Sequence, residues 1–473
     1  MTGSIAITMI AAALLAACGE QNPAYCRAHP EDTDCPRGDG GPDVDAPPVT
    51  CDSADDCMAP TPVCKLSSQI CVQCTEATEA TECTGNKPVC EPTLDVCRAC
   101  SAHSDCSSAV CLPDGSCAPT AEVSYVDGAV PLGSTTCSQA APCPTLEEGF
   151  KPTPARRYLK LTGAITDSRA ALIDNRNVTI FAAPGASLNR SNTGDVCEIK
   201  GTSNVTIHDL TIRNATNGNG LFVRESATVT LNAVKIHGNA GSGILFSGGN
   251  LTVLDSSVYQ NTTNGISATA GMLTVRDSSV YENPTSGITA VGTGLLTIGS
   301  SVIAFNGTTG TAGVGLSINS DFSITNTIIA ANGGTLSTQG GVVLATSNPA
   351  AVFQFNTVAN NRSSAGVALG KRGINCTAAA VALTNSIVAD NDVAGACTVT
   401  YSLTAAAIAG TGNKVGDPMF LDVGSNALVA GFYRIATGSP ARDSANPAAT
   451  LAVDIDGDPR PTGAADMGAD EAQ

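Results

Sequence analysis

The amino-acid sequence predicts an all-β fold, and three features that repeat in step carry this prediction. A glycine followed by an aliphatic residue returns every 22–28 residues between Gly220 and Gly341. Each period also contains three short stretches of alternating apolar and polar residues, which is the signal of β-strands. An asparagine returns with the same period, at Asn214, Asn239, Asn261, Asn283, Asn306, Asn332 and Asn391, with Asn360 or Asn361 filling the gap.

The length of the period predicts how these strands are arranged. Three strands in about 22 residues leave turns too short for a helical crossover, so each period describes one coil of a parallel β-helix. Alternate aliphatic residues such as Ile266 and Ile288 then point into one shared lumen. Connections between parallel strands are almost always right-handed. We therefore expect a right-handed parallel β-helix over residues 120–415, preceded by a disulfide-rich repeat stalk.

The repeating asparagines have a structural role in such a coil. We expect them at a bend, where asparagine tolerates the left-handed backbone conformation. A stacked column of their amides can satisfy turn groups that are otherwise buried without partners.

The stalk is predicted from three units of four cysteines within residues 51–119. Such short units cannot build a hydrophobic core, so we expect two disulfides in each, with the pairing left open. The alternative is zinc, because Cys71 and Cys74, and Cys97 and Cys100, have ligand spacing. The units are Cys51, Cys57, Cys64 and Cys71; Cys74, Cys83, Cys90 and Cys97; and Cys100, Cys106, Cys111 and Cys117.

The remaining cysteines fall into short-range pairs. Cys197 is left over, and we expect it to be a buried free thiol. The expected pairs are Cys26 with Cys35, Cys137 with Cys143, and Cys376 with Cys397.

The first residues predict export. The apolar stretch 5–17 is too short to span a bilayer but suits a signal peptide, with an ordinary signal peptide as the alternative. It ends in Leu15-Ala16-Ala17-Cys18-Gly19, which resembles the lipobox of bacterial lipoproteins. The resemblance implies that residues 1–17 are removed, that Cys18 carries the lipid, and that the protein is anchored at the bacterial outer membrane or cell surface. Residues 18–50 are rich in Pro, Gly and Asp and predict a solvated linker.

The charge distribution divides the chain and excludes some functions. Residues 1–150 carry a net charge of -16, residues 151–442 carry +4, and the last 31 residues carry -6, which sum to -18. A chain this acidic has no basic surface of the size that nucleic acid requires. Polybasic binding to a membrane surface is excluded for the same reason.

Two family resemblances rest on these patterns. The coil repeats resemble the pectate-lyase-like family of right-handed parallel β-helix proteins. Residues 416–473 contain Asp417-Pro418-Met419-Phe420, followed by the segments 438–443 and 454–461, and resemble the C-terminal part of choice-of-anchor Q domain proteins. We expect this acidic region to cap the open end of the helix, which would otherwise expose a parallel edge.

Catalytic residues are weakly indicated. Polygalacturonase-type hydrolases of this fold use clustered Asp residues with a Gly-His-Gly element. This sequence lacks that element, and His237-Gly238-Asn239 is the nearest match. Asp255 and Asp277 lie one coil apart, so their backbones should stack at about 4.8 Å, with Arg276 beside them. A retaining carboxylate pair has similar spacing. The alternative is that both residues form turns, because Ser or Asn stands at this position in other coils.

A binding surface is predicted two residues before the repeating asparagine. His237, Tyr259 and Tyr281 occupy this place in three consecutive coils and should face outward. Such a strip can stack on sugar rings and hydrogen-bond their hydroxyls. The alternative is that the rings stack on one another and only support the sheet.

The acidic tail contains one candidate metal site. Asp454, Asp456 and Asp458 alternate around a glycine, as oxygen ligands of Ca²⁺ often do, and Asp466, Asp470 or Glu471 could complete the set. The alternative is a solvated acidic turn.

These observations leave two functional hypotheses. The first is a noncatalytic surface lipoprotein, a monomer whose β-helix binds a glycan or another envelope component. The second is a surface-displayed polysaccharide lyase or glycoside hydrolase, which rests on fold analogy.

Overall fold

The computed structural model describes residues 50–131, 136–310, 313–364, 373–378 and 381–472. These residues form two compact units, one of residues 50–105 with 111–117 and the other of residues 106–110 with 118–472. The predicted lipidation site Cys18 and the pair Cys26 and Cys35 lie outside the described residues. In the part of the chain that is described, no helix is both long and apolar enough to cross a membrane.

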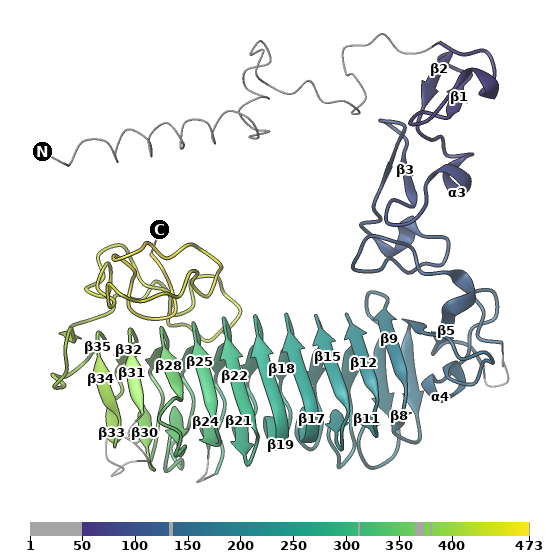
Figure 1. Cartoon of the computed structure of the whole chain (residues 1–473). Coiled ribbons are helices and arrows are strands. Elements are labelled where there is room, and N and C mark those ends of the chain that lie inside the picture. Colours follow the sequence, from purple (N-terminus) through teal and green to yellow (C-terminus); the bar gives the residue numbers. More distant parts are fainter. Residues whose placement is uncertain (1–49, 132–135, 311–312, 365–372, 379–380, 473) are drawn as a thin grey trace, which may run out of the picture. The chain divides into compact units, whose positions relative to one another are not determined.

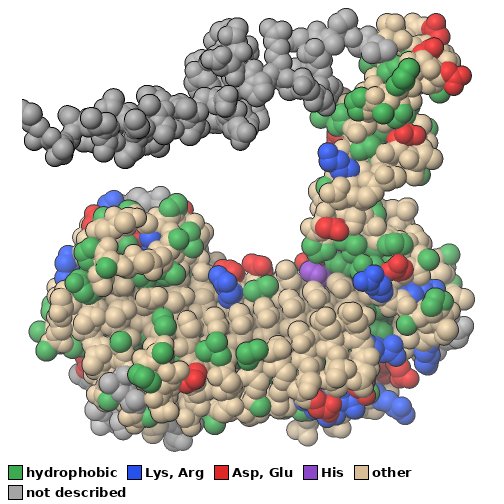
Figure 2. Space-filling model, in the orientation of Figure 1, with side chains coloured by type: hydrophobic (Ala, Val, Ile, Leu, Met, Phe, Trp, Pro, Cys, Tyr) green, Lys and Arg blue, Asp and Glu red, His purple; other side chains and the backbone are tan. Residues whose placement is uncertain are grey.

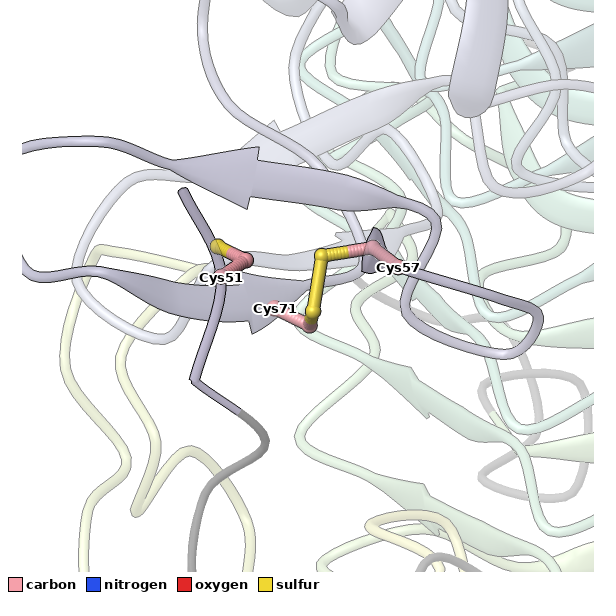
Figure 3. A group of neighbouring side chains, drawn as sticks. All are labelled: Cys51, Cys57 and Cys71. Atoms are coloured by element: carbon pink, nitrogen blue, oxygen red, sulfur yellow. A yellow bond between two sulfur atoms is a disulfide. The ribbon is translucent and has the colours of Figure 1, made fainter. Parts of the chain in front are cut away.

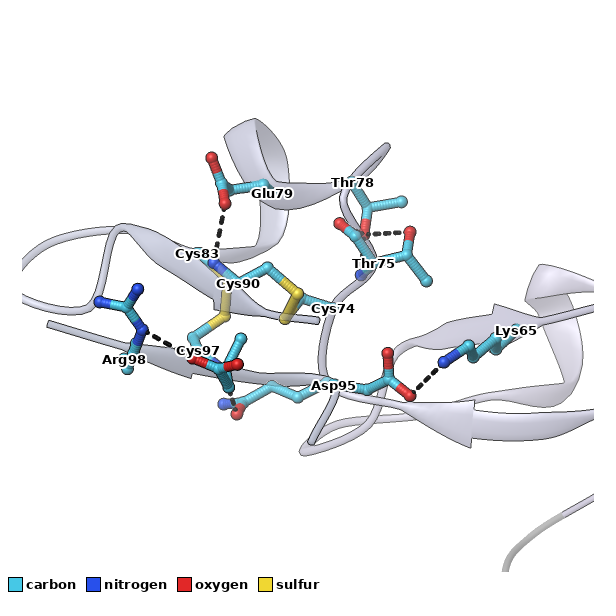
Figure 4. Close-up of a disulfide and its surroundings, with 12 residues drawn as sticks. Lys65, Cys74, Thr75, Thr78, Glu79, Cys83, Cys90, Asp95, Cys97 and Arg98 are labelled. Carbon is cyan, nitrogen blue, oxygen red and sulfur yellow. Dashed lines mark hydrogen bonds and ion pairs between the residues drawn. A yellow bond between two sulfur atoms is a disulfide. The ribbon is translucent and has the colours of Figure 1, made fainter. Parts of the chain in front are cut away.

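The first unit consists of small modules built around disulfides. In the first two modules the first cysteine pairs with the third, and the second pairs with the fourth. Figure 3 shows the bond between Cys57 and Cys71, and Figure 4 shows the cysteines of the second module. Cys74, Cys83, Cys90 and Cys97 form a buried cluster of their own, so disulfides take the place of a hydrophobic core. In the third module Cys100 pairs with Cys111, and both Cys106 and Cys117 are disulfide-bonded.

Each of the first two modules contains an antiparallel hairpin, formed by β1 with β2 and by β3 with β4. The zinc alternative does not hold, because all four sulfur atoms with ligand spacing are in disulfides. The elements are η1 (Ala54–Asp56), β1 (Val63–Lys65), β2 (Ile70–Val72), α3 (Glu79–Glu82), β3 (Val89–Glu91), β4 (Val96–Arg98) and η2 (His103–Asp105).

The second unit is a parallel β-solenoid, which confirms the all-β prediction (Figure 1). One of its sheets has twelve strands, all paired in parallel, with one strand from each successive coil. These strands are β7 (Ala164–Asp167), β10 (Ser187–Arg190), β13 (Thr211–Arg213), β16 (Lys235–His237), β18 (Ser257–Tyr259), β20 (Ser279–Tyr281), β23 (Val302–Ala304), β26 (Ile328–Ala330), β29 (Thr357–Ala359), β32 (Ile387–Ala389), β35 (Leu403–Thr404) and β36 (Lys414–Val415).

A second sheet of twenty strands forms the other faces of each coil. It bends around a corner, because β17 pairs with both β14 and β15. The short helices η3 (Thr120–Glu122) and α4 (Leu146–Gly149) lie near its start. Its strands are β5 (Val123–Asp127), β6 (Tyr158–Thr162), β8 (Ala171–Asp174), β9 (Asn177–Ala182), β11 (Cys197–Lys200), β12 (Asn204–His208), β14 (Leu221–Val223), β15 (Thr228–Asn232), β17 (Ile244–Leu254), β19 (Asn264–Arg276), β21 (Ser286–Val291), β22 (Leu295–Gly299), β24 (Val314–Asn319), β25 (Phe322–Thr325), β27 (Val342–Leu344), β28 (Val352–Gln354), β30 (Ile374–Cys376), β31 (Ala382–Thr384), β33 (Val393–Gly395) and β34 (Thr398–Thr400).

The lumen of the solenoid is the hydrophobic core. Ile244, Ile266, Ile288 and Leu316 follow one another in register on successive coils, and none of them is exposed. Each coil therefore contributes aliphatic side chains to one continuous column, as the alternating sequence pattern predicts. Burial of these side chains is the main source of stability for the unit.

The remaining cysteines lie in the second unit. Cys137 is bonded to Cys143 and Cys376 to Cys397, the pairs expected from their spacing. Cys197 is buried and free, and its burial raises the pKa of the thiol to about 12. A thiol that stays protonated is a poor nucleophile, so Cys197 is a packing residue.

A ladder of buried asparagines runs along one bend of the solenoid. The side-chain Nδ2 of each member donates to Oδ1 of the member in the next coil at 2.8–3.1 Å. The same amide of Asn283 also donates to the carbonyls of Val258 and Tyr281, both at 3.0 Å. The ladder consists of Asn239, Asn261, Asn283, Asn306, Asn332, Asn361 and Asn391.

Two details of the predicted ladder are wrong. Asn214 is exposed and outside it, because Ala215 occupies the ladder position and donates its backbone N–H to Asn239. The left-handed conformation belongs to the residue before each ladder asparagine, as at Gln260 (φ 51°) and Glu282 (φ 55°). That residue turns the chain, and the asparagine that follows points inward.

The ladder explains why the glycine repeat has the same period. A Cβ on Gly265 would lie 2.8 Å from the Nδ2 atom of Asn283 and 2.4 Å from a methyl carbon of Val280. The ladder amide therefore occupies the space that any larger residue at the glycine would need. The two repeats stay in step because their members are in contact.

A second ladder, which the sequence analysis missed, runs along the next bend. The backbone N–H of Ser256 donates to the hydroxyl of Ser278 at 3.1 Å, and that of Ser278 donates to Ser301 at 3.3 Å. Each hydroxyl also donates to a carbonyl two residues earlier. Thr327, Asn356, Ser386 and Ser402 continue this position in later coils.

The tail, residues 416–472, packs against the outer face of the twelve-stranded sheet (Figure 1). Four alanines that face outward in register, Ala304, Ala330, Ala359 and Ala389, are buried in one cluster with tail residues that include Phe432 and Met467. The sequence analysis placed the tail over the open end of the solenoid. That placement is wrong, because these contacts put it along the side.

The asparagine ladder generates a stability prediction. Asn283→Ala should lower the free energy of unfolding by about 3 kcal/mol, because it leaves buried donors of Asn261 and two buried carbonyls without partners. Chemical denaturation measures this value.

Asn214→Gly is the matched control, since Asn214 belongs to the sequence repeat but not to the ladder, and glycine accepts its φ of 64°. It should cost less than about 1 kcal/mol. Equal effects of the two substitutions would contradict a special role for the ladder.

Candidate functional site

The part of the twelve-stranded sheet before β23 carries the aromatic column, which consists of His237, Tyr259 and Tyr281. These residues end β16, β18 and β20 and lie in register on consecutive coils. The residue before each is buried in the lumen, so the three rings point outward. The prediction that these side chains line up on the outer face agrees with this register.

The rings of the aromatic column stack on one another. The centroids of His237 and Tyr259 are 4.7 Å apart with an interplanar angle of 13°, and those of Tyr259 and Tyr281 are 4.9 Å apart and parallel. Both faces of Tyr259 are therefore covered, and a sugar ring cannot stack on them. This geometry agrees with the alternative that the rings stack on one another. The column presents the edges of these rings to solvent.

The edges of the column carry neutral hydrogen-bonding groups. Burial raises the pKa of Tyr281 to about 12, helped by Tyr259 and Glu282, and burial also raises the pKa of Tyr259. Burial, together with nearby Arg213 and Lys235, lowers the pKa of His237. Among the described residues, neither tyrosine hydroxyl has a hydrogen-bond partner, so both are available to a ligand as protonated donors.

A second outward column runs beside the first. Lys235, Ser257 and Ser279 stand two residues before the aromatic residues on the same three strands and are in register. Strand alternation places both columns on the same face. We call the aromatic column together with Ser257 and Ser279 the polar track.

The candidate catalytic pair belongs to a turn. Asp255 and Asp277 have left-handed backbones (φ 48° and 50°), and Ser300 and Asn326 adopt the same conformation in later coils. Each stands directly before a residue of the second ladder. Partial desolvation raises the pKa of Asp277, and the charge of Arg276 opposes this shift. Turn formation, the alternative weighed for these residues, therefore accounts for the whole column.

A shallow groove opens where the tail meets the polar track. It has a volume of about 290 Å³, and the solenoid and the tail each form one of its walls. On the tail side Arg434 holds Asp456 with two hydrogen bonds, at 2.6 and 2.7 Å. The sequence analysis missed this groove, because its walls are more than 130 residues apart in the chain. It is lined by Asp277, Ser278, Ser279, Ser300, Val302, Arg434, Ile455 and Asp456.

The acidic residues of the tail are engaged with protein groups. Oδ1 of Asp454 accepts the backbone N–H groups of Asp456 and Asp458, and its Oδ2 accepts that of Glu471. Asp470, and not Asp458, completes the closest carboxylate cluster with Asp454 and Asp456. Since Arg434 already neutralises Asp456 and lies 3.6 Å from Asp470, these residues fit an ion-pair network better than a calcium ion.

Arg460 fastens the tail to the solenoid. Its side chain is 1% exposed and donates to Glu471 at 3.0 Å and to Asn326 of the solenoid at 3.1 Å. The guanidinium also lies 4.4 Å from the ring centroid of Phe355. Because this buried guanidinium has several partners, it holds the tail at one position on the sheet. That position determines how much of the polar track the tail leaves uncovered.

Sequence comparison agrees with this architecture. Residues 164–303 and 268–424 match the family described as "Right handed beta helix region", and together they cover more than half of the chain. The chain belongs to the right-handed beta helix family. A search of curated proteins finds no match.

Two solved structures are similar to this right-handed beta helix protein. Pectate lyase Pel9A is 15% identical and has a TM-score of 0.54, with the match covering 79% of this chain and 100% of the lyase. The enzymatically active domain of tailspike protein 2 from bacteriophage CBA120 is 13% identical, with a TM-score of 0.38 over 55% of this chain and 42% of that domain. At these identities the likeness concerns the fold alone.

The tail carboxylates generate a pH prediction. Burial raises the pKa of Asp470 from 3.8 to about 6 and that of Glu471 from 4.5 to about 7. Carboxyls with raised pKa values bind protons more tightly when the tail is docked. Docking should therefore be strongest below about pH 4, weaken as the pH rises from about 4 to about 7, and change little above that range.

Hydrogen exchange of tail amides, corrected for the intrinsic rate at each pH, measures this trend. Glu471→Gln should make the dependence shallower, because it removes the group with the higher pKa. Tail amides that become better protected between pH 5 and pH 8 would contradict the prediction.

Proposed function

We propose that this protein is a noncatalytic glycan-binding protein held at the bacterial cell surface. The observation that carries the proposal is the polar track, in which tyrosine hydroxyls, an imidazole and serine hydroxyls repeat in register along the outer face of three coils. Repetition at the strand spacing of about 4.8 Å suits an extended polymer that offers hydroxyls at regular intervals along the solenoid axis.

In this proposal the aromatic residues do not stack on sugar rings, as the sequence analysis first considered. Their faces are covered by one another, so the ligand would contact ring edges and hydrogen-bond the hydroxyls. The stack holds these hydroxyls in fixed positions before the ligand arrives. Preorganised groups of this kind lose little side-chain entropy on binding.

The engagement of the carboxylates supports binding over catalysis. Acid–base chemistry on a polysaccharide requires carboxyl groups that are open to the substrate and arranged as a pair or around a metal. In the described residues, the tail carboxyls with raised pKa values are buried in the network around Arg434 and Arg460. Asp277 is exposed, but Asp277 and Asp255 occupy equivalent turn positions in neighbouring coils, and turn formation accounts for both residues.

The proposed location rests on the sequence. Lipid at Cys18 would attach the chain to the membrane, and the linker and disulfide-bonded modules would separate the solenoid from it. We propose that the protein acts as a monomer at the outer membrane or cell surface, and that its ligand is a polysaccharide or another envelope component.

The second candidate function is polysaccharide lyase or glycoside hydrolase activity, which the similarity in fold to pectate lyase Pel9A favours. Purified protein incubated with polygalacturonate and with neutral polysaccharides, with and without Ca²⁺, should release no unsaturated products or new reducing ends. Sustained product release would replace the binding proposal, and dependence on Ca²⁺ would identify a lyase.

Removal of the track hydroxyls tests the binding proposal. Tyr259→Phe with Tyr281→Phe should weaken retention of the protein in polysaccharide affinity gels about thirtyfold, on the basis of about 1 kcal/mol for each of the two lost hydrogen bonds. The melting temperature should not change, because phenylalanine keeps the stacked rings. Alanine would be a poorer choice, since it also removes the stacking energy.

Tyr158→Phe is the control for this pair. Tyr158 is half-buried on β6, outside the polar track, so the loss of its hydroxyl should leave retention unchanged. Equal retention of the wild-type protein and the double variant would rule out the track as the binding surface.

A further inference from the structure

The groove between the tail and the solenoid continues the polar track. Ser279, which lines the groove, and Tyr281, which ends the aromatic column, belong to the same strand, β20. The next strand brings Val302 into register with Ser279, and there the tail residues Arg434 and Asp456 form the opposite wall. A chain molecule lying along the track would therefore reach the groove with one end.

The electrostatics of the groove differ from those at the start of the track. Among the described residues, the carboxylate of Asp277 makes no hydrogen bond or ion pair. The guanidinium of Arg434 is already engaged by Asp456 through two hydrogen bonds and lies 3.6 Å from Asp470. The groove lining thus offers a free carboxylate acceptor, whereas the charge of its one cation, Arg434, is already shared by Asp456 and Asp470. The Nη1 atom of Arg434 has no partner among the described residues, but it is buried and not open to a ligand.

Arg276 is the nearest additional positive charge on the solenoid side. It precedes Asp277 and opposes the rise in the pKa of that carboxyl, but it ends β19 in the other sheet and does not line the groove. The hydroxyls of Ser279 and Ser300, which have no hydrogen-bond partner in the described part of the chain, line the groove together with Asp277. This combination accepts hydrogen bonds from hydroxyl groups and repels a second carboxylate.

We propose that the groove is the terminal subsite of the polar track and that it binds a neutral sugar residue. Hydroxyl groups of the sugar donate to the carboxylate of Asp277, and the hydroxyls of Ser279 and Ser300 complete the contacts. The proposal rests on the glycan-binding function and narrows its ligand to neutral polysaccharides. A uronic acid would bring its carboxylate against Asp277 and Asp456 with no cation free to pair with it.

Affinity gels with single polysaccharides test this inference on the full-length protein. The gels would contain a soluble glucan, a galactomannan, an arabinoxylan or polygalacturonate. At least one neutral polymer should retain the protein more strongly than polygalacturonate at moderate salt. Asp277→Asn should weaken that retention about fivefold, because the amide keeps one acceptor oxygen but loses the charge.

Asp255→Asn is the matched control. Asp255 occupies the same turn position one coil earlier, with φ 48° against 50°, and does not line the groove. Asparagine stands at this turn position in other coils, including Asn326 and Asn385, so both variants should fold. Asp255→Asn should leave retention unchanged.

Ser300→Ala supplies a second variant without any change of charge, and retention should fall about twofold to fivefold. The subsite is overturned if Asp277→Asn and Asp255→Asn weaken retention equally, or if neither Asp277→Asn nor Ser300→Ala weakens it. Stronger retention by polygalacturonate than by every neutral polymer also overturns it. If the subsite is overturned but the variant with Tyr259→Phe and Tyr281→Phe still weakens retention, the proposed glycan-binding function stands without the subsite. If no polymer retains the wild-type protein, the subsite and the proposed function are both contradicted.

Discussion

The structure depends on the hydrogen bonds that pass from one asparagine amide to the next along the bend of the solenoid. Each coil must turn sharply, and a turn inside a stack of coils buries polar backbone groups that water cannot reach. The amide of Asn283 satisfies two such carbonyls and bonds to the next ladder member, so each coil completes the hydrogen bonding of its neighbour. The close contact with Gly265 follows from this, because the amide fills the space of a side chain. The ladder thereby fixes the register in which outward-facing residues stack.

This register arranges the outer face on which we propose that the ligand binds, and the tail determines how much of that face is uncovered. Beyond Tyr281 the outward column consists of alanines, which form a smooth surface that the tail covers. Arg460 binds the tail to the solenoid through Asn326. The same column therefore presents polar ring edges where it is open and small apolar side chains where it is covered. The boundary between the two regions is also the place where the tail supplies Arg434 and Asp456 to the groove.

Periodicity made the solenoid predictable from the sequence. The glycine and asparagine repeats and the alternating strands predicted the coil, the shared lumen and the outward direction of Tyr259. Local sequence patterns did not predict contacts between residues that are far apart in the chain. Nothing in the sequence around Asp456 indicates that this residue faces Asp277 across a groove. The sequence analysis left two interpretations of Tyr259 and Tyr281 open, stacking on each other and stacking on a sugar, because the sequence indicates the position of a ring but not its tilt. Asn214 was misplaced by one residue, since the period alone does not distinguish the turn residue from the ladder residue that follows it.

The most direct test of the account is hydroxyl-radical footprinting of the protein with and without a bound neutral polysaccharide. Modification of His237, Tyr259 and Tyr281 should fall when the polymer is added, since their edges form the polar track. Met272 and Leu421, which are 53% and 64% exposed on the twenty-stranded sheet and on the tail, should be modified equally in both samples. Unchanged modification of the two tyrosines, or protection confined to Met272 or Leu421, would contradict the claim that the outer face of the twelve-stranded sheet is the binding surface.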